Sequence, residues 1–427
     1  MIGVALGLLI VLLALSIPVG IGLGLLGLFL NGIYSPMPLT VMLGELTWST
    51  SNSFVMVAVP LYILLGEIVL RSGMADRVYN ALVQWVSWLP GGLMHSNIAG
   101  CAAFGAISGS SVATAVTVGS VALGEVKKRH YNERLFLGTL AAGGTLGILI
   151  PPSIAMIVYG VLTETSIPKL YLAGIIPGLA LTALFSLTVV GICLLKPGYG
   201  GDRIETNWAM RFRTLPDLIP PAVIFVVVIG SIYAGLATAT ESAALGVVAA
   251  LALAVFYRTL SWTMLRQVLE GTVRTTASIM LIIIGAYFLN IVINAIGLTS
   301  EISNFITAMK LTPTQLLIAV CIFYLVLGCF METLSMIVAT VPIITPLMVA
   351  AGFDPVWIGV VIVLLMETAL ITPPVGLNLF VVQGIRERGQ VQDVVIGAAP
   401  FVVTLLIGIA MISIFPQIVL WLPQMAR

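Results

Sequence analysis

The sequence predicts an all-α polytopic membrane protein with two inverted repeats, each containing a re-entrant helical hairpin and a broken transmembrane helix. Three observations predict this fold class: a very apolar composition, two similar motifs that contain Pro-Pro pairs, and a one-sided distribution of basic residues. Proline pairs should interrupt a helix, because proline has no N–H to donate and clashes with the preceding turn.

Composition establishes that the chain lies in a membrane. Of its 427 residues, 60% are hydrophobic and 8% are charged, and the mean hydropathy is +1.16. Soluble domains have roughly 25% charged residues, so this chain lacks the polar surface of a water-soluble globule. Apolar runs such as 220–235 and 243–257 favour helices over the alternating strands of a barrel. The apolar composition makes the lipid bilayer the expected surroundings. The net charge of +1 indicates no partner, and no nucleic-acid partner is expected.

The two Pro-Pro pairs lie in similar surroundings. Pro151–Pro152 lies in GTLGILIPPSIAMIVYG, and Pro373–Pro374 lies in METALITPPVGLNLF. The pairs are 222 positions apart (373 minus 151). Each interrupts an apolar run that is otherwise suited to a membrane helix, so each predicts a broken helix.

A compact apolar hairpin is predicted before each break. The first spans 100–124 and turns at 108–111, and the second spans 322–349 and turns near Glu332 and Thr333. Farther upstream, each half has an amphipathic segment with a glycine at a corresponding place, Gly73 and Gly297. The shared order of span, short arm, hairpin and broken helix indicates an internal repeat.

Basic residues orient the two halves. If each hairpin enters and leaves on one side and each broken helix crosses, a cytoplasmic amino terminus puts all 18 Lys and Arg residues inside except Lys169, Lys310 and Arg427. This threading opens the first hairpin to the cytoplasm and the second to the outside, so the halves are inverted. It also places the carboxyl terminus in the periplasm. The amino-terminal apolar segment has no basic region before it and no clear cleavage site, so we expect it to be a retained span and not a signal peptide.

The repeats divide the chain into seven predicted segments. In order, they are an N-terminal span and scaffold segment (1–53), a scaffold span and arm (54–90), the first transport half (91–165), connecting scaffold spans (166–275), a second scaffold span and arm (276–312), the second transport half (313–385) and a C-terminal span (386–427).

The breaks predict two cation sites. A broken helix leaves carbonyl groups without amide partners, and such oxygens can bind a hard cation such as Na⁺. The facing hairpin tips add hydroxyl and turn carbonyl oxygens. The first predicted Na⁺ site consists of Ser108, Ser110, Gly147 and Ile150, and the second of Gly328, Glu332, Ala369 and Thr372.

The substrate is expected between these sites. Amide groups at the start of each following half-helix favour an anion such as a carboxylate. The predicted substrate contacts are Ser110, Ser111, Thr114, Pro152, Thr333, Pro374 and Asn378. Neither hairpin nor either break contains Lys or Arg, so we expect no fixed basic residue of this chain at the anion. The alternative is that the prolines only kink helices and that the small residues serve close packing.

Three glutamates receive separate predictions. Glu332 and Glu367 lie in identical MET tripeptides, and a carboxyl group at membrane depth is a functional candidate. Each could bind Na⁺ or transfer a proton, or it could be satisfied by amides of the hairpin. Glu241 begins an apolar run and is expected to cap that helix.

Four stretches resemble the large membrane subunit (DctM type) of tripartite ATP-independent periplasmic (TRAP) transporters. They are SGSSVATAVTVGSVALGEVKKRHYNERL, AAGGTLGILIPPSIAMIVYG, PIITPLMVAAGFDPVWIGV and ITPPVGLNLFV, and the resemblance extends over essentially the whole chain. It implies a fold like that of the ion-transporter superfamily and an elevator-type secondary importer. The implied activity is sodium-driven uptake of organic acids across the bacterial inner membrane. In that family the second hairpin often has Asp where this chain has Glu332.

The resemblance also implies partners and leaves the substrate open. Two or more Na⁺ ions, a small four-helix membrane subunit and a periplasmic substrate-binding protein are expected. The substrate could be a C4-dicarboxylate, sialic acid or another sugar acid. Because the resemblance begins near the start of the chain, the small subunit would be a separate protein.

Other functions are weighed against the sequence. An ATP-driven pump needs a phosphate-binding loop such as GxxxxGK[ST], and a metalloprotease needs HExxH; the sequence has neither. An enzyme is therefore not expected. The remaining alternatives are a proton-coupled elevator-type organic-anion transporter of another family, and a channel.

Overall fold

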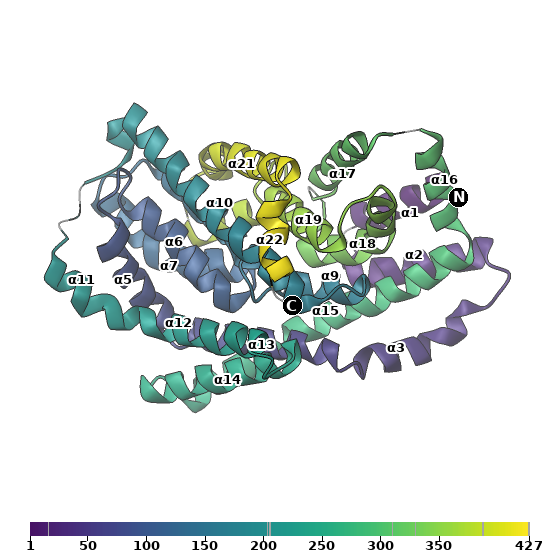
Figure 1. Ribbon diagram of the computed structural model, residues 1–427, viewed down its shortest axis with the longest axis horizontal. Coiled ribbons are helices and arrows are strands. Elements are labelled where there is room, and N and C mark those ends of the chain that lie inside the picture. Colours follow the sequence, from purple (N-terminus) through teal and green to yellow (C-terminus); the bar gives the residue numbers. More distant parts are fainter. Residues whose placement is uncertain are drawn as a thin grey trace.

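The structure is a computed structural model that describes residues 1–15, 17–202, 204, 206–309, 311–328, 330–386 and 388–425. In these ranges it is helical (Figure 1), and its extended pairing is one isolated bridge between Tyr131 and Gly200. Six of the described helices are long and apolar enough to cross a membrane, and the number rises to eight if each of two bent helix pairs counts as one span. The predicted all-α polytopic class is confirmed.

One group of helices lies along the lower side of Figure 1. Helices α2 (Val19–Tyr34) and α4 (Ala58–Arg71) pack against α15 (Trp262–Ala295), and α14 (Ala239–Phe256) packs against α4. Glycines allow the close approach of α2 and α15, because a Cβ on Gly20 would lie 2.9 Å from the backbone nitrogen of Ile282.

This group includes a bend that the sequence analysis did not predict. The stretch that contains α3 (Leu43–Ser51) and the stretch that ends in α4 form a bent helix pair, with an angle of 64° between its two parts. Three further helices, α11 (Trp208–Thr214), α12 (Ile219–Phe225) and α13 (Ser231–Tyr233), belong to one apolar helical stretch.

Two short helices correspond to the predicted arms. They are α5 (Met74–Val86) and α16 (Leu298–Ala308). Gly73 precedes α5 with φ of +70°, and Gly297 precedes α16 with φ of +76°. A backbone in this left-handed region favours glycine, so the two glycines give the same sharp turn from a span into an arm.

Each half contains the predicted hairpin and broken helix. In the first half these are α6 (Leu93–Ser108), α7 (Ser111–Lys128), α8 (Glu133–Leu149) and α9 (Ile154–Leu162). In the second they are α17 (Pro313–Leu327), α18 (Thr333–Ala350), α19 (Pro355–Leu370) and α20 (Leu377–Arg386). The α8 and α9 axes differ by 43°, and both Pro-Pro peptide bonds are cis.

Contacts between the two halves show that the broken helices run in opposite directions. At one end, Arg386 of α20 pairs with Glu133 at the start of α8, with Nε and Oε1 2.8 Å apart. At the other end, the Tyr159 hydroxyl of α9 donates to the Pro355 carbonyl at the start of α19 over 2.7 Å. The start of each broken helix therefore meets the end of the other, as inverted repeats require.

Three other helices pack against the repeats. They are α10 (Ile167–Leu195), α21 (Val391–Ile414) and α22 (Gln417–Met425), and α10 contacts α8, α21 and α22. The closest packing is between α8 and α21, where Gly138 contacts Gly397 and any larger side chain would collide with backbone. An ion pair of Arg134 with Asp393 (2.9 Å) joins the starts of the same two helices.

The amino terminus lies elsewhere than predicted. The threading put it on the opposite side from the arm 298–308, but the Met1 amino group lies 3.6 Å from the carboxylate of Glu301 in α16. Helix α2 runs parallel to α15, since Gly20 lies against Ile282 and Gly27 against Leu289. Helix α1 (Ile2–Ala14) packs against α2 and α16. The chain therefore turns back between α1 and α2 instead of forming one continuous span.

Candidate functional site

The first hairpin tip packs directly against the first helix break, and we call this contact the first junction (residues 108–111 with 149–153). A Cβ on Gly109 would lie 2.9 Å from the Pro152 carbonyl oxygen. The Ser108 and Thr114 hydroxyl oxygens are 2.9 Å apart, and the Ser110 hydroxyl accepts from the Ala113 amide at the start of α7. The tip is thus held by its own hydroxyl groups.

The break supplies carbonyl groups to this junction. Pro151 and Pro152 have no N–H, so the Gly147 and Ile148 carbonyls have no donor four residues ahead. Gly147 lies against the tip: a Cβ there would be 2.7 Å from the Thr114 hydroxyl and 3.0 Å from the Ser110 carbonyl. The Ile150 side chain packs on Gly178 of α10, so Ile150 could reach the junction through its main chain alone.

The second junction (tip residues 328 and 330–332 with the helix end and break at 369–376) is built differently. Gly328 contacts the Ala369 side chain closely enough that no Cβ would fit. The Thr372 hydroxyl donates to the Thr368 carbonyl over 2.6 Å, within its own helix end. Glu332 is the N-cap of α18, where its Oε1 accepts from the Ser335 amide at 3.0 Å and the Ser335 hydroxyl at 2.9 Å. Gly328 and Ala369 meet as predicted, whereas Glu332 lines a cavity and Thr372 is satisfied locally.

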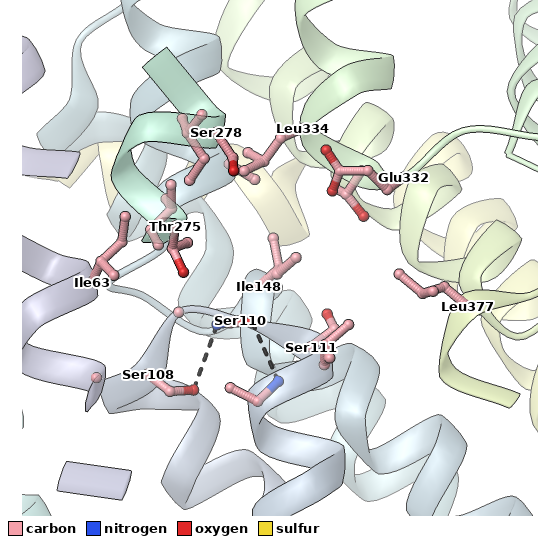
Figure 2. A pocket seen from close by; sticks show the side chains of 18 of the residues that line it. Ile63, Ser108, Ser110, Ser111, Ile148, Thr275, Ser278, Glu332, Leu334 and Leu377 are labelled. Carbon is pink, nitrogen blue, oxygen red and sulfur yellow. Dashed lines mark hydrogen bonds between the residues drawn. The ribbon is translucent and has the colours of Figure 1, made fainter. Parts of the chain in front are cut away.

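A cavity of about 650 Å³ lies between the two hairpin tips and a wall made by α4 and α15. Figure 2 shows Thr275 and Ser278 on one side of it and Glu332 on the other, with Ser110 and Ser111 of the first tip below. Further lining comes from Ile148 and Ile154, which flank the first break, and from Leu370 and Leu377, which flank the second. Both tips and both breaks therefore border one space.

The predicted substrate contacts divide into two sets. Ser110, Ser111 and Thr333 line the cavity, whereas Thr114, Pro152, Pro374 and Asn378 are not among its lining residues. Thr114 is buried and paired with Ser108. Asn378 is buried, and its side-chain amide donates to the Ala141 carbonyl over 3.3 Å. These two side chains form hydrogen bonds inside the protein and do not face the cavity.

The wall contributes residues that the sequence analysis did not predict. Glu67 of α4 and Arg274, Thr275 and Ser278 of α15 all line the cavity. Arg274 therefore lines the cavity although neither hairpin nor either break contains Lys or Arg, because the prediction considered the hairpins and breaks and not the helices that face them. A signal was available: Arg274, Thr275 and Ser278 share one face of a helix that continues into a long apolar run.

The three glutamates have distinct surroundings. Glu367 is fully buried and accepts a hydrogen bond of 2.7 Å from the Ser111 hydroxyl, while its Oε1 has no hydrogen-bond partner among the described residues. It joins the first tip to the second broken helix and does not line the cavity. Glu241 forms a capping box with Thr238 at the start of α14, as predicted. Glu332 is the one of the three that faces the cavity.

The donor set indicates which cation could bind here. The described residues contain no group of three or more His, Cys, Asp and Glu side chains suited to a metal ion. Both junctions instead offer carbonyl and hydroxyl oxygens, which suit hard cations and not soft transition metals.

Comparison with known proteins places the chain in a family. Residues 6–418 match the family described as tripartite ATP-independent periplasmic transporter, DctM component. The chain is 34% identical over 381 residues to the C4-dicarboxylate TRAP transporter large permease protein DctM of Pseudomonas aeruginosa, covering 88% of each. It is 32% identical to the ectoine permease TeaC of Halomonas elongata, covering 87% of this chain and 86% of the relative. It is 31% identical to the sialic acid permease SiaM of Vibrio cholerae, covering 88% and 87%.

The fold also resembles a solved structure. The Alcanivorax borkumensis YdaH transporter matches with a TM-score of 0.63 and 16% identity, covering 88% of this chain and 87% of that one. At this identity the likeness concerns the fold alone. The family match and the relatives lead to one conclusion: the chain is a multi-pass membrane transport protein, not an enzyme, and belongs to the DctM family of large permease subunits of TRAP transporters.

Proposed function

We propose that this chain is the transport subunit of a Na⁺-coupled secondary importer that takes up an organic acid by an elevator mechanism. The observation that carries the proposal is the position of the cavity: both hairpin tips and both helix breaks border it. Broken helices in inverted repeats are where secondary transporters bind substrate and coupling ions.

Two Na⁺ ions would bind at the two junctions. At the first, the ligands would be oxygens of Ser108, Ser110, Gly147 and Ile150; at the second, oxygens of Gly328, Glu332, Ala369 and Thr372. Support comes from the Gly147 position against Ser110 and from the Gly328 contact with Ala369. Because its hydroxyl is satisfied locally, Thr372 would contribute its carbonyl oxygen. A cation at each tip would lower the cost of bringing a carboxylate into the cavity.

An elevator motion would move the hairpins and broken helices as one body past α4 and α15. Contacts across the repeats favour a single body: Ser111 with Glu367, Asn378 with Ala141, and Arg386 with Glu133. The wall across the cavity would stay fixed, and the arms α5 and α16 would connect the moving body to it.

The same proposal covers location and partners. We place the chain in the bacterial inner membrane with a small four-helix membrane subunit and a periplasmic substrate-binding protein. The basic ends at 127–134 and 386–388 would face the cytoplasm. The carboxyl terminus would face the periplasm, and so would the amino terminus, because it lies beside α16 at the far end of α15. The relatives are named for C4-dicarboxylates, ectoine and sialic acid, so an organic acid of this range is the expected cargo.

The test is uptake into proteoliposomes that contain this chain and the small subunit, with the binding protein loaded with substrate outside. An inward Na⁺ gradient at a fixed proton gradient should drive accumulation, and omission of the binding protein should abolish it. Accumulation that follows the proton gradient and ignores Na⁺ would instead support the alternative, a proton-coupled elevator-type organic-anion transporter. Currents far above the turnover of a carrier would indicate a channel.

A further inference from the structure

The cavity wall includes a polar face of α15. Arg274, Thr275 and Ser278 of α15 line the cavity together with Ile279 and Ile282. Residues at these spacings lie on one side of a helix. All three polar residues are exposed, and Figure 2 shows Thr275 and Ser278 facing the space that separates them from Glu332.

Three ionisable residues appear among the described lining residues: Glu67, Glu332 and Arg274. The Glu67 carboxylate is paired with Arg71, with Nε and Oε2 3.0 Å apart. Arg71 also donates to the Gln267 side chain over 3.2 Å, and Gly271 leaves room for the Glu67 carboxylate against α15. Glu67 is therefore neutralised within a contact that joins α4 to α15.

Glu332 is also partly satisfied, because one of its oxygens accepts two hydrogen bonds from Ser335. Arg274 differs from both carboxylates. In the part of the chain that the structure describes, its guanidinium forms no ion pair or side-chain hydrogen bond. The Ser278 hydroxyl donates to the Arg274 carbonyl at 3.1 Å, which leaves all the guanidinium donors available.

We propose that Arg274 is the anion-recognition group of this cavity: a cation on the stationary wall that attracts and binds a carboxylate group of a solute held at the hairpin tips. Guanidinium suits this task, because its planar donors match the two oxygens of a carboxylate. The inference rests on the proposed function for the identity of the solute as an organic acid. It goes beyond it by assigning substrate recognition to a helix that belongs to neither hairpin nor either broken helix.

The position on the wall has a functional consequence. Groups on the tips would travel with the solute, whereas Arg274 would meet it only when the tips lie opposite this part of α15. Contact with a fixed cation would then distinguish the state seen here from one in which the tips have moved. Because Arg274 is exposed to solvent, the attraction should weaken as ionic strength rises.

A charge-sensitive cysteine reaction tests the proposal without any transport assay. The four native cysteines are replaced by alanine, and Ser278→Cys is introduced in the full chain in open membrane fragments. The rates of modification by anionic methanethiosulfonate ethylsulfonate and cationic methanethiosulfonate ethyltrimethylammonium are then compared. Arg274→Gln should lower the anionic-to-cationic rate ratio about fivefold, as expected for one unit charge within roughly 7 Å in water. Arg274→Lys should keep the ratio close to that of the parent chain.

Arg266 provides a matched control on the same helix. It is exposed, pairs with Glu270 at 2.7 Å, and is not among the lining residues. Twelve residues of helix put it roughly 18 Å from position 278, beyond the Debye length of about 8 Å at physiological salt. Arg266→Gln should leave the ratio unchanged. An equal fall with both variants, or no fall with Arg274→Gln, would overturn the proposal.

Binding is measured in the same preparation with succinate as the probe carboxylate and 1,4-butanediol as its uncharged counterpart. Succinate should slow the cationic reagent at Ser278→Cys, with a half-protecting concentration roughly fivefold higher in Arg274→Gln. Equal protection by the diol, or the same succinate concentration in both chains, would show that Arg274 does not recognise the carboxylate. Neither assay uses an ion gradient, so loss of Na⁺ coupling would refute the proposed function and leave this result standing.

Discussion

The two junctions come from the same sequence pattern but have different structures. At the first, Pro151 and Pro152 are buried and the tip is fixed by the Ser108–Thr114 hydroxyl pair. At the second, Pro373 and Pro374 are exposed, and the Thr372 hydroxyl bonds within its own helix. The first junction is therefore packed inside the protein, whereas the break of the second lies at the protein surface. The same sequence pattern in two inverted repeats thus gives two different packing environments.

The largest effect is expected from filling the first junction. In Gly147→Ala, the new Cβ would lie 2.7 Å from the Thr114 hydroxyl, which Ser108 already holds. Overpacking of this kind costs about 1–3 kcal/mol, so uptake in proteoliposomes should fall at least about fivefold. Gly124→Ala is the matched control on α7, since nothing lies within 4 Å of its Cβ position. Normal uptake by Gly147→Ala would show that the tip and break do not need this close fit.

The next largest effect is expected from removing the hydrogen bond between Ser111 and Glu367, which joins the two halves. Glu367→Ala should lower the midpoint of thermal unfolding in detergent, because the buried Ser111 hydroxyl loses its acceptor. The expected loss is about 1–3 kcal/mol, with a smaller loss for Glu367→Gln, which keeps an acceptor oxygen. Ser111→Ala combined with Glu367→Ala should be less destabilised than the two single effects added together. Strict additivity would mean that the two side chains do not interact.

A smaller effect is expected at the exposed second junction. Glu332→Gln retains an oxygen for the N-cap of α18 but removes the charge that faces the cavity. The Na⁺ concentration that half-saturates uptake should rise about fivefold, because charged ligands bind more strongly than neutral ones. Ser110→Ala, which removes one neutral oxygen from the first junction, should raise it less. The reverse order would mean that the first junction supplies the stronger cation site.

The smallest effect is expected for Thr372→Val. Its hydroxyl is used by the Thr368 carbonyl, so any Na⁺ ligand from this residue is the main-chain oxygen, which valine keeps. Half-saturation by Na⁺ should change less than about twofold. A large rise would show that the hydroxyl turns towards the ion when the second junction closes.

Sequence reasoning predicted the local features of the site and not the partners that face them. The breaks, the tips and the pairing of each tip with its own break were predicted, because prolines, small residues and apolar runs act on nearby backbone. Predicted ligands such as Gly147 and Ser110 do meet. Thr114 and Asn378 are buried and do not line the cavity, because a polar residue near a tip can face the cavity or the protein interior, and only packing selects between them.

By itself, the sequence determined that this chain is a helical membrane protein with two inverted halves, each with one hairpin and one broken helix. Hydropathy, proline chemistry and the placement of basic residues determine these features because they are properties of short segments. Tertiary structure alone decided what lies across the cavity. It set Arg274 and Glu67 opposite the tips, joined Ser111 to Glu367, and turned the amino terminus back towards α16. These contacts join residues distant in sequence, and the shapes of the packed helices, not local preference, determine which of them meet.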